Sequence, residues 1–334
     1  MSNILVTGGA GYIGSFMVRA LLDKGFNVTV IDSLERGHRD AIDRRANFIK
    51  GDIKDEDFLK EVFLNQKFDA ILHFAGYISV EESARNPEKY EENNVLGSKR
   101  LFDAAINMGN VRNIIFSSTA AVYGNPEIIP IPEDHPKNPT SPYGRTKLKT
   151  EENLKQLREN NPDINFVCLR YFNAAGGALD GSMGENHSPE THIIPLAIRT
   201  ALSNGTFRLY GTDYDTPDGT CIRDYIHVLD LVEAHILALK KLEEDGGGYF
   251  YNVGTGRGYS NREVIDMVKK ISGADFKVEE ESRRSGDADQ LIADPSKIRS
   301  ELGFETKYSD LKTIVESAYK WHVRNLGFRI QNSE

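Results

Sequence analysis

The sequence predicts an α/β protein with a doubly wound parallel sheet and a smaller mixed α/β lobe. Short apolar runs alternate with segments of helical period from residue 3 to about 172. A glycine-rich turn follows the first run, and small or polar residues follow the later ones. Such an alternation forms a parallel sheet covered by helices on both faces. Ligands of these sheets bind at the carboxyl ends of the strands.

Composition narrows the class of protein. The chain has 334 residues, 39% apolar and 27% charged, with a net charge of 41 − 50 = −9. An acidic chain without basic runs argues against general nucleic-acid binding. No window approaches ~18 continuous apolar residues, so we expect no membrane span. The first residues show no charged n-region before an apolar core, so we expect no signal peptide. Cys168 and Cys221 lie in no CxxC pair or Cys/His cluster, so we expect reduced thiols, a cytoplasmic location and no metal.

The first strand, residues 3–7, ends at Gly8, Gly11 and Gly14, and a helix pattern follows. Gly8 permits a tight turn, Gly11 lets backbone approach a pyrophosphate, and Gly14 lets the helix pack closely on the strand. Asp32 ends the second strand, 18 residues after Gly14, where a carboxylate binds ribose hydroxyls and repels a 2′-phosphate. The pattern predicts a Rossmann-type site for NAD rather than NADP, although Arg36 lies near enough to help a phosphate. Tyr12, Ile13 and Ser33 belong to this predicted site.

Later strands end in residues suited to the same cofactor. Strand 46–50 precedes Asp52 and Ile53, and strand 69–74 ends at Phe74-Ala75-Gly76, where small residues let backbone lie against a ligand. We interpret His73 as structural. Helix pattern 88–107 contains Asn94, and strand 113–117 ends at Ser117. The remaining predicted cofactor residues are Tyr143, Lys147 and Tyr171.

Tyr143 and Lys147 are one turn apart if residues 143–158 are helical. A fixed ammonium favours a phenolate, so this tyrosine is a candidate base. Taken alone, the pair is better explained as an ordinary surface Tyr and Lys, and the rest of the chain must support the catalytic interpretation. The proline-rich loop 126–142 leads into it without strand or helix period.

The second half of the chain divides between two lobes. We expect a NAD-binding domain of residues 1–175 plus about 228–252, a substrate domain of about 176–227 and 253–327, and a tail at 328–334. Residues 174–192 and 211–220 have the composition of loops. Helices are predicted at 193–203, 228–241, 261–272 and 309–324, and strands at 207–210 and 249–252.

Thr119, Tyr143 and Lys147 complete the Ser/Thr–Tyr–Lys set of the short-chain dehydrogenase/reductase superfamily. The glycine spacing resembles its extended branch. More narrowly, the stretch from Tyr210-Gly211-Thr212 to Arg223-Asp224-Tyr225-Ile226-His227 resembles the UDP-glucose 4-epimerases. This resemblance implies NAD-dependent interconversion of UDP-galactose and UDP-glucose through a transient 4-keto sugar and NADH. The NAD would stay tightly bound, because each turnover regenerates it.

The resemblance also implies roles for residues. Tyr143 would be the base, with Lys147 and Thr119 beside it. The UDP-sugar would be bound by Thr119, Tyr143, Asn173, His192, Ile193, Tyr210, Arg223, Arg284, Asp287 and Leu291. Relatives form homodimers through helices that correspond here to about 88–107 and 143–158.

Several features separate close alternatives. Ala120 and Ala121 stand where dehydratases and decarboxylases carry acids, which favours simple oxidation and re-reduction. Ile78 replaces a lysine common in the family. Leu291 is smaller than the tyrosine of some members, so we hypothesise that UDP-GlcNAc is also accepted. The alternatives are a uronate epimerase, a 4-reductase that releases its cofactor, or a dinucleotide sensor without activity.

Overall fold

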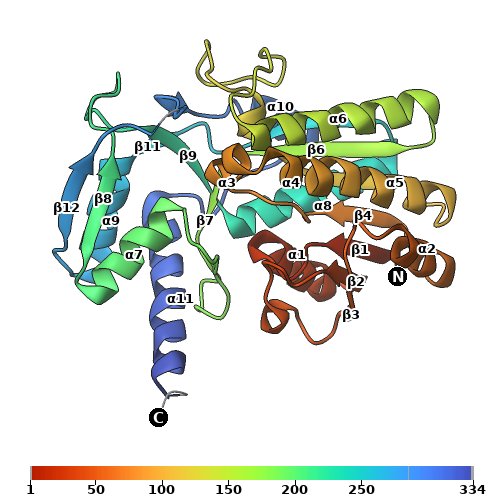
Figure 1. The fold of residues 1–334 in the computed structure, drawn as a ribbon, viewed down its shortest axis with the longest axis horizontal. Helices are drawn as coiled ribbons and strands as arrows, with labels where there is room; N and C mark the ends of the chain where they lie inside the picture. Colours follow the sequence, from red (N-terminus) through yellow and green to blue (C-terminus); the bar gives the residue numbers. More distant parts are fainter. Residues whose placement is uncertain (1, 285, 332–334) are drawn as a thin grey trace.

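The computed structural model describes residues 2–284 and 286–331 (Figure 1). One lobe is built on a seven-stranded sheet, and the other contains smaller sheets packed with α7, α9 and α11. The first lobe comprises β1 (Asn3–Thr7), α1 (Tyr12–Asp23), β2 (Asn27–Asp32), η1 (Arg39–Ala41), β3 (Asn47–Lys50), α2 (Glu56–Asn65), β4 (Ala70–His73), α3 (Val80–Arg85), α4 (Pro87–Tyr90), η2 (Glu91–Gly97), α5 (Ser98–Asn107), β5 (Asn113–Thr119), η3 (Ala120–Val122), α6 (Pro142–Asn160), β6 (Asn165–Tyr171), α8 (Val228–Asp245), β10 (Gly248–Val253) and α10 (Ser296–Leu302). The second comprises β7 (Asn173–Ala175), α7 (Ile193–Ser203), β8 (Thr206–Tyr210), β9 (Ile222–His227), β11 (Gly258–Ser260), α9 (Asn261–Ser272), β12 (Lys277–Glu281), β13 (Gln290–Leu291) and α11 (Leu311–Gln331).

The large sheet has the strand order β3-β2-β1-β4-β5-β6-β10, and each of these pairings is parallel. The order reverses between β1 and β4, and a crevice opens at such a switch point beside the carboxyl ends of the strands. The predicted doubly wound sheet is therefore confirmed.

Helices cover both faces of this sheet because alternate strand residues point to opposite sides. Ile4 and Val6 pack with α1 and α8, whereas Leu5 packs with α2 and α5 in a separate core. Strands buried on both faces are almost wholly apolar, which is why β1 and β4 appear in the sequence as continuous apolar runs.

The second lobe is organised around β9, which pairs with β7, β11 and β13. Its β8 and β12 form a separate parallel pair, and α7, α9 and α11 enclose a third core. Between these segments, α8 and β10 return to the first lobe. Ile298 and Phe304 also belong to the core of the first lobe, although the sequence assigned all of 253–327 to the second.

Several element boundaries differ from the predicted ones. The helix expected at 88–107 is three consecutive pieces, α4, the π-helical η2 and α5. The short α3 was not predicted, and α11 continues through residue 331, so much of the expected tail is helical. Residues 332–334 of that tail lie outside the described residues. Among the described helices, none combines the length and the apolar character needed to cross a membrane.

Candidate active site

A cavity of about 910 Å³ lies where the carboxyl ends of the large sheet meet the second lobe. It collects most of the site residues that the sequence predicts, from elements far apart in the chain. The predicted residues that line it are Gly8, Gly11, Tyr12, Ile13, Gly14, Asp32, Ser33, Asp52, Ile53, Phe74, Ala75, Gly76, Ser117, Thr119, Tyr143, Lys147, Tyr171, Asn173, His192, Ile193, Arg223 and Leu291.

The glycine turn forms a close-packed cradle at one end of this cavity. A Cβ on Gly8 would lie 2.5 Å from the Ala75 nitrogen, and one on Gly14 would lie 2.2 Å from the Gly8 oxygen. Gly11 has more room, since its nearest neighbour would be the Gly8 oxygen at 3.3 Å. Gly11 is also the N-cap of α1 and makes no side-chain cap bond. The first amides of α1 are thus suited to an anion such as a pyrophosphate.

Asp32 lies beside this turn at the end of β2. Its carboxylate accepts hydrogen bonds from the backbone amides of Ala10, at 3.0 Å, and Leu34, at 2.8 Å. Burial raises the pKa of Asp32, and these two amides oppose the rise. Arg36 is paired with Glu82 at 2.9 Å, so its guanidinium is already compensated. The glycine turn and the Asp32 carboxylate together fit a dinucleotide whose adenosine ribose carries free hydroxyls and no 2′-phosphate.

Tyr143 reaches the cavity because α6 starts at a defined point. The Ser141 side chain caps the helix by accepting from the Gly144 amide at 3.1 Å, and Pro142 occupies the first turn. A Cβ on Gly144 would lie 2.6 Å from the Ala121 oxygen. The glycine after Tyr143 therefore allows α6 to approach the end of β5, where Thr119 lies.

Lys147 lies one turn further along α6 and is buried, with 3% of its surface exposed. Its Nζ donates to the Ser117 carbonyl at 2.8 Å and lies 4.8 Å from the centre of the Phe116 ring. Burial lowers the pKa of Lys147 to about 8, partly offset by Glu151. The ammonium is therefore fixed in place at the wall of the cavity.

The electrostatics of Tyr143 correct a prediction from the sequence. We expected the neighbouring ammonium to lower the phenol pKa, but desolvation raises the pKa of Tyr143 to about 12. Hydrogen bonding with Thr119 opposes that rise without cancelling it. Desolvation therefore favours the protonated phenol, and additional positive charge in the cavity would favour its ionisation.

Two residues near the glycine turn, His73 and Asn94, have their polar side-chain atoms hydrogen-bonded to other protein groups. His73 is buried between the Thr7 hydroxyl, 2.6 Å from Nδ1, and the Ser98 hydroxyl, 2.8 Å from Nε2. Burial lowers its pKa to about 3, which agrees with the structural interpretation. Asn94 was predicted to contact the cofactor, but it does not line the cavity. Its amide instead bonds both backbone groups of Tyr77, at 2.8 and 3.0 Å, from within η2.

The predicted substrate residues separate into two groups. Arg223 and Leu291 are register partners on adjacent strands and both line the cavity. Tyr210, Arg284 and Asp287 lie together outside its lining: the Arg284 guanidinium is 5.4 Å from the centre of the Tyr210 ring and its Nε is 3.2 Å from Asp287.

Sequence reasoning missed part of the cavity wall. α3 contributes Val80 to Glu82, and the loop before α7 contributes Glu185, His187 and Glu190. A signal for α3 was available, since Ser79 caps it by accepting from the Glu82 amide at 3.1 Å, in the Ser-x-x-Glu pattern of a helix start. The loop carries a Glu-x-His-x-x-Glu-x-His spacing that we did not single out.

Known proteins resemble the chain over nearly all of its length. A UDP-glucose 4-epimerase from Lactobacillus helveticus is 46% identical over 320 residues, covering 96% of each chain. The crystal structure of a UDP-glucose 4-epimerase from Brucella ovis in complex with NAD is 45% identical, with a TM-score of 0.91 over 96% of this chain and 98% of that one. A UDP-Glc/GlcNAc 4-epimerase from Campylobacter jejuni is 43% identical, with a TM-score of 0.85 over 97% of this chain and 100% of that one.

The family model for the NAD dependent epimerase/dehydratase family matches residues 4–254. That range contains the glycine turn, Asp32, Thr119, Tyr143 and Lys147 around the one cavity described above. The resemblance inferred from the sequence is confirmed, and the chain belongs to the NAD dependent epimerase/dehydratase family.

Proposed function

We propose that this chain is a UDP-glucose 4-epimerase that interconverts UDP-galactose and UDP-glucose in galactose metabolism. The observation that carries the proposal is the placement of Tyr143, Lys147 and Thr119 on the wall of the cavity that also contains the glycine turn and Asp32. Relatives of that activity cover nearly the whole chain. Bound NAD would supply hydride transfer at sugar C4 and a positive ring beside the phenol.

Tyr143 is the proton carrier of the proposed reaction. The Tyr143 phenolate would take the proton of the sugar 4-hydroxyl as a hydride leaves C4 for the bound NAD. Once the 4-keto sugar has rotated and the hydride has returned to the other face of C4, Tyr143 would give the proton back to the same sugar oxygen. Desolvation raises the pKa of Tyr143 to about 12 in the protein alone, so a positive cofactor charge beside the phenol would favour the phenolate. Thr119 adds a hydrogen bond that favours the phenolate.

The surrounding residues restrict the reaction to C4. Ala120 and Ala121 line the cavity where an acid would be needed to expel water, and neither can move a proton. Arg223 lines the cavity, and its guanidinium would hold a diphosphate by charge-assisted hydrogen bonds. A firm grip on the diphosphate and a loose one on the hexose allow both faces of the keto sugar to reach the cofactor.

The N-acetylated sugars form a second substrate class. Leu291 lines the cavity beside Arg223 and leaves more space than a tyrosine would. The similar Campylobacter jejuni protein is described as a UDP-Glc/GlcNAc 4-epimerase. We therefore extend the proposal to UDP-GlcNAc and UDP-GalNAc.

The enzyme is also proposed to be a cytoplasmic homodimer that pairs through the continuous α4–η2–α5 segment and α6. Sedimentation equilibrium at two protein concentrations tests this assembly, and a monomer at micromolar concentration would contradict it.

A direct assay tests the activity. Purified protein is incubated with UDP-galactose without added nicotinamide, and the products are separated by chromatography. Formation of UDP-glucose is expected, as is release of about one NAD per chain on denaturation. A protein that consumes added NADH and accumulates a reduced sugar would instead be a reductase, and one that releases NAD without converting any sugar would be a sensor.

A further inference from the structure

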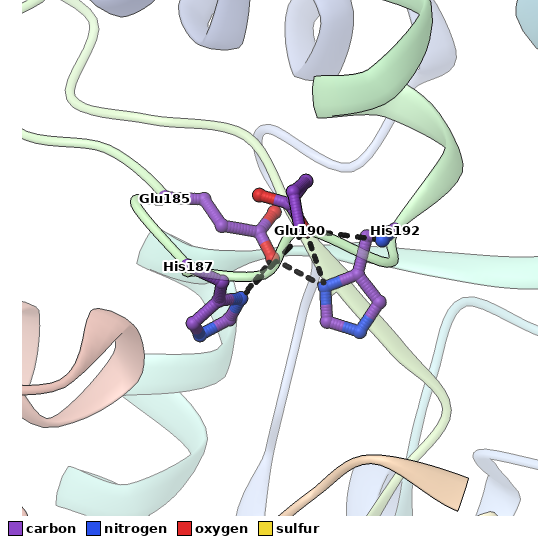
Figure 2. A group of neighbouring side chains, drawn as sticks. All are labelled: Glu185, His187, Glu190 and His192. Atoms are coloured by element: carbon purple, nitrogen blue, oxygen red, sulfur yellow. Dashed lines mark hydrogen bonds and ion pairs between the residues drawn. The ribbon is translucent and has the colours of Figure 1, made fainter. Parts of the chain in front are cut away.

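The loop before α7 brings together two histidines and two glutamates from eight consecutive residues. Figure 2 shows the side chains of Glu185, His187, Glu190 and His192 turned toward a common point. One ligand atom from each lies within 4.8 Å of all the others. No cysteine is involved, and the described residues contain no other such group. We propose that this cluster is a binding site for one divalent transition-metal ion of the Zn²⁺ class.

The donor atoms lie close enough together for one metal ion to bind all four after small movements. Oε1 of Glu185 lies 3.0 Å from Nδ1 of His187 and contacts Nδ1 of His192. Oε1 of Glu190 lies 3.9 Å from each of these two nitrogens. Tetrahedral ligands at Zn²⁺ distances are about 3.4 Å from one another. Small side-chain adjustments would therefore place all four atoms around one ion.

The types of donor favour a transition metal over calcium or magnesium. Imidazole nitrogen suits zinc, nickel and cobalt, whereas calcium and magnesium prefer sites made only of oxygen. Both histidines present the same ring nitrogen, Nδ1, to the cluster. Nδ1 of His187 is buried without a hydrogen-bond partner of good geometry. A buried ring nitrogen of this kind needs either a proton and an acceptor or a metal.

The charges of the cluster match a divalent cation. The Glu185 and Glu190 side chains are 4% and 1% exposed, so both carboxylates need compensation. Nη2 of Arg199 on α7 lies 3.5 Å from Oε2 of Glu190 and supplies part of this charge compensation. One divalent ion with two neutral imidazoles gives the cluster the same net charge as two imidazolium ions. The competing state is therefore a metal-free network in which both histidines are protonated and paired with the two glutamates. The test must distinguish this network from a metal site.

Hydrogen bonds from neighbouring residues hold the loop and one of its carboxylates in place. Oε1 of Glu190, the proposed ligand atom, accepts from the amides of Thr191, at 2.8 Å, and His192, at 3.0 Å. Trp321 of α11 donates to the Glu185 carbonyl at 3.1 Å, and Arg36 donates to the Ser188 carbonyl at 3.2 Å. Supporting bonds of this kind orient ligands before a metal arrives. A bound ion would join the loop to the start of α7 along the cavity wall.

Zinc binding to the full-length, tag-free protein tests the proposal. After EDTA treatment and removal of the chelator, calorimetric titration with Zn²⁺ should give one ion per chain, and Zn²⁺ should raise the melting temperature. His187→Gln and Glu190→Gln should each weaken binding by more than about 100-fold, because they remove a ligand rather than a supporting group. His38→Gln is the matched control, since His38 bonds the Asn186 carbonyl of the same loop at 3.0 Å without belonging to the cluster.

A spectroscopic readout keeps the test independent of variant stability. Co²⁺ in the wild-type cluster should give visible absorption bands typical of a four-coordinate site, and added Zn²⁺ should remove them. If Zn²⁺ binds wild type no more tightly than His187→Gln, or if Co²⁺ gives only the spectrum of the hydrated ion, the cluster is the metal-free network and the proposal is wrong.

Discussion

Arg170 on β6 donates from Nε and Nη2 to the two carboxylate oxygens of Glu151 on α6, at 2.9 and 2.7 Å. Both side chains are 2% exposed, so the pair is buried. Ser118 completes it by donating to Glu151 at 2.5 Å. Glu151 lies one turn beyond Lys147, and the pair thus fixes the helix that carries Tyr143 against the sheet.

Removing one member of this pair should destabilise the protein strongly. Arg170→Met leaves the Glu151 carboxylate buried without its bidentate partner, and we expect a loss of about 3–5 kcal/mol in the free energy of unfolding. The double variant Arg170→Met/Glu151→Leu should recover much of that loss, because neither charge of the pair then remains buried. Urea unfolding of the three proteins measures both effects. A loss below about 1 kcal/mol in the single variant would contradict this account of the pair.

Lys147 should make stability depend on pH. Its pKa of about 8 in the folded protein lies below the ordinary value of 10.5, so the unfolded chain binds more protons between these two pH values. Stability from this residue therefore rises as the pH increases from 8 to 10.5, and the cost of the buried ammonium is fully present below pH 8. The shift corresponds to about 3 kcal/mol.

Comparison with Lys147→Met isolates this contribution. The difference in unfolding free energy between wild type and the variant should move in favour of wild type by up to about 3 kcal/mol between pH 8 and 10.5. The contributions of groups that titrate identically in both proteins cancel in this difference. Urea unfolding at pH 7.5, 9 and 10.5 provides the measurement, and a difference that stays constant over this range would show that Lys147 has an ordinary pKa.

Tyr143→Phe should slow epimerisation by about 10²–10⁴-fold without loss of the cofactor. The substitution removes the proposed proton carrier, and general acid–base groups contribute about 10²–10⁴ in rate. Retained NAD, measured after denaturation, would separate lost chemistry from lost binding. Tyr249→Phe on β10 is the control, because Tyr249 stacks on Tyr251 and does not line the cavity. Full activity in the Tyr143 variant would rule out the mechanism.

The sequence predicted the first lobe well, because buried parallel strands and a glycine turn leave strong local signals. Gly8, Gly11 and Gly14 followed by Asp32 specify one geometry, and the structure has it. The second lobe was less predictable. Its strands β11 and β13 have only three and two residues, and they exist through pairing with β9 rather than through their own apolar pattern.

Most residues that line the cavity were predictable from the sequence, but the electrostatics were not. Spacing on a helix placed Tyr143 near Lys147, yet the ammonium is committed to the Ser117 carbonyl and the phenol is desolvated. Burial depends on how α6 packs against β5, which no local pattern reveals. Asn94 illustrates the same limit, since its amide supports the Tyr77 backbone only because η2 widens the helix there.

Leu291→Tyr should separate the two proposed substrate classes. Leu291 is half-buried in the cavity wall beside Arg223, and a phenol ring there would occupy the space that an N-acetyl group needs. We expect the activity with UDP-GlcNAc to fall by about 10–200-fold, because a misfit of this size is worth about 1–3 kcal/mol. Activity with UDP-galactose should change by less than about threefold. Leu291→Met keeps the side-chain volume and should retain both activities. Epimerisation of both sugars at wild-type rates in the tyrosine variant would mean that Leu291 does not set the size of the sugar site, and a wild-type protein inactive on UDP-GlcNAc would limit the enzyme to the simple hexoses.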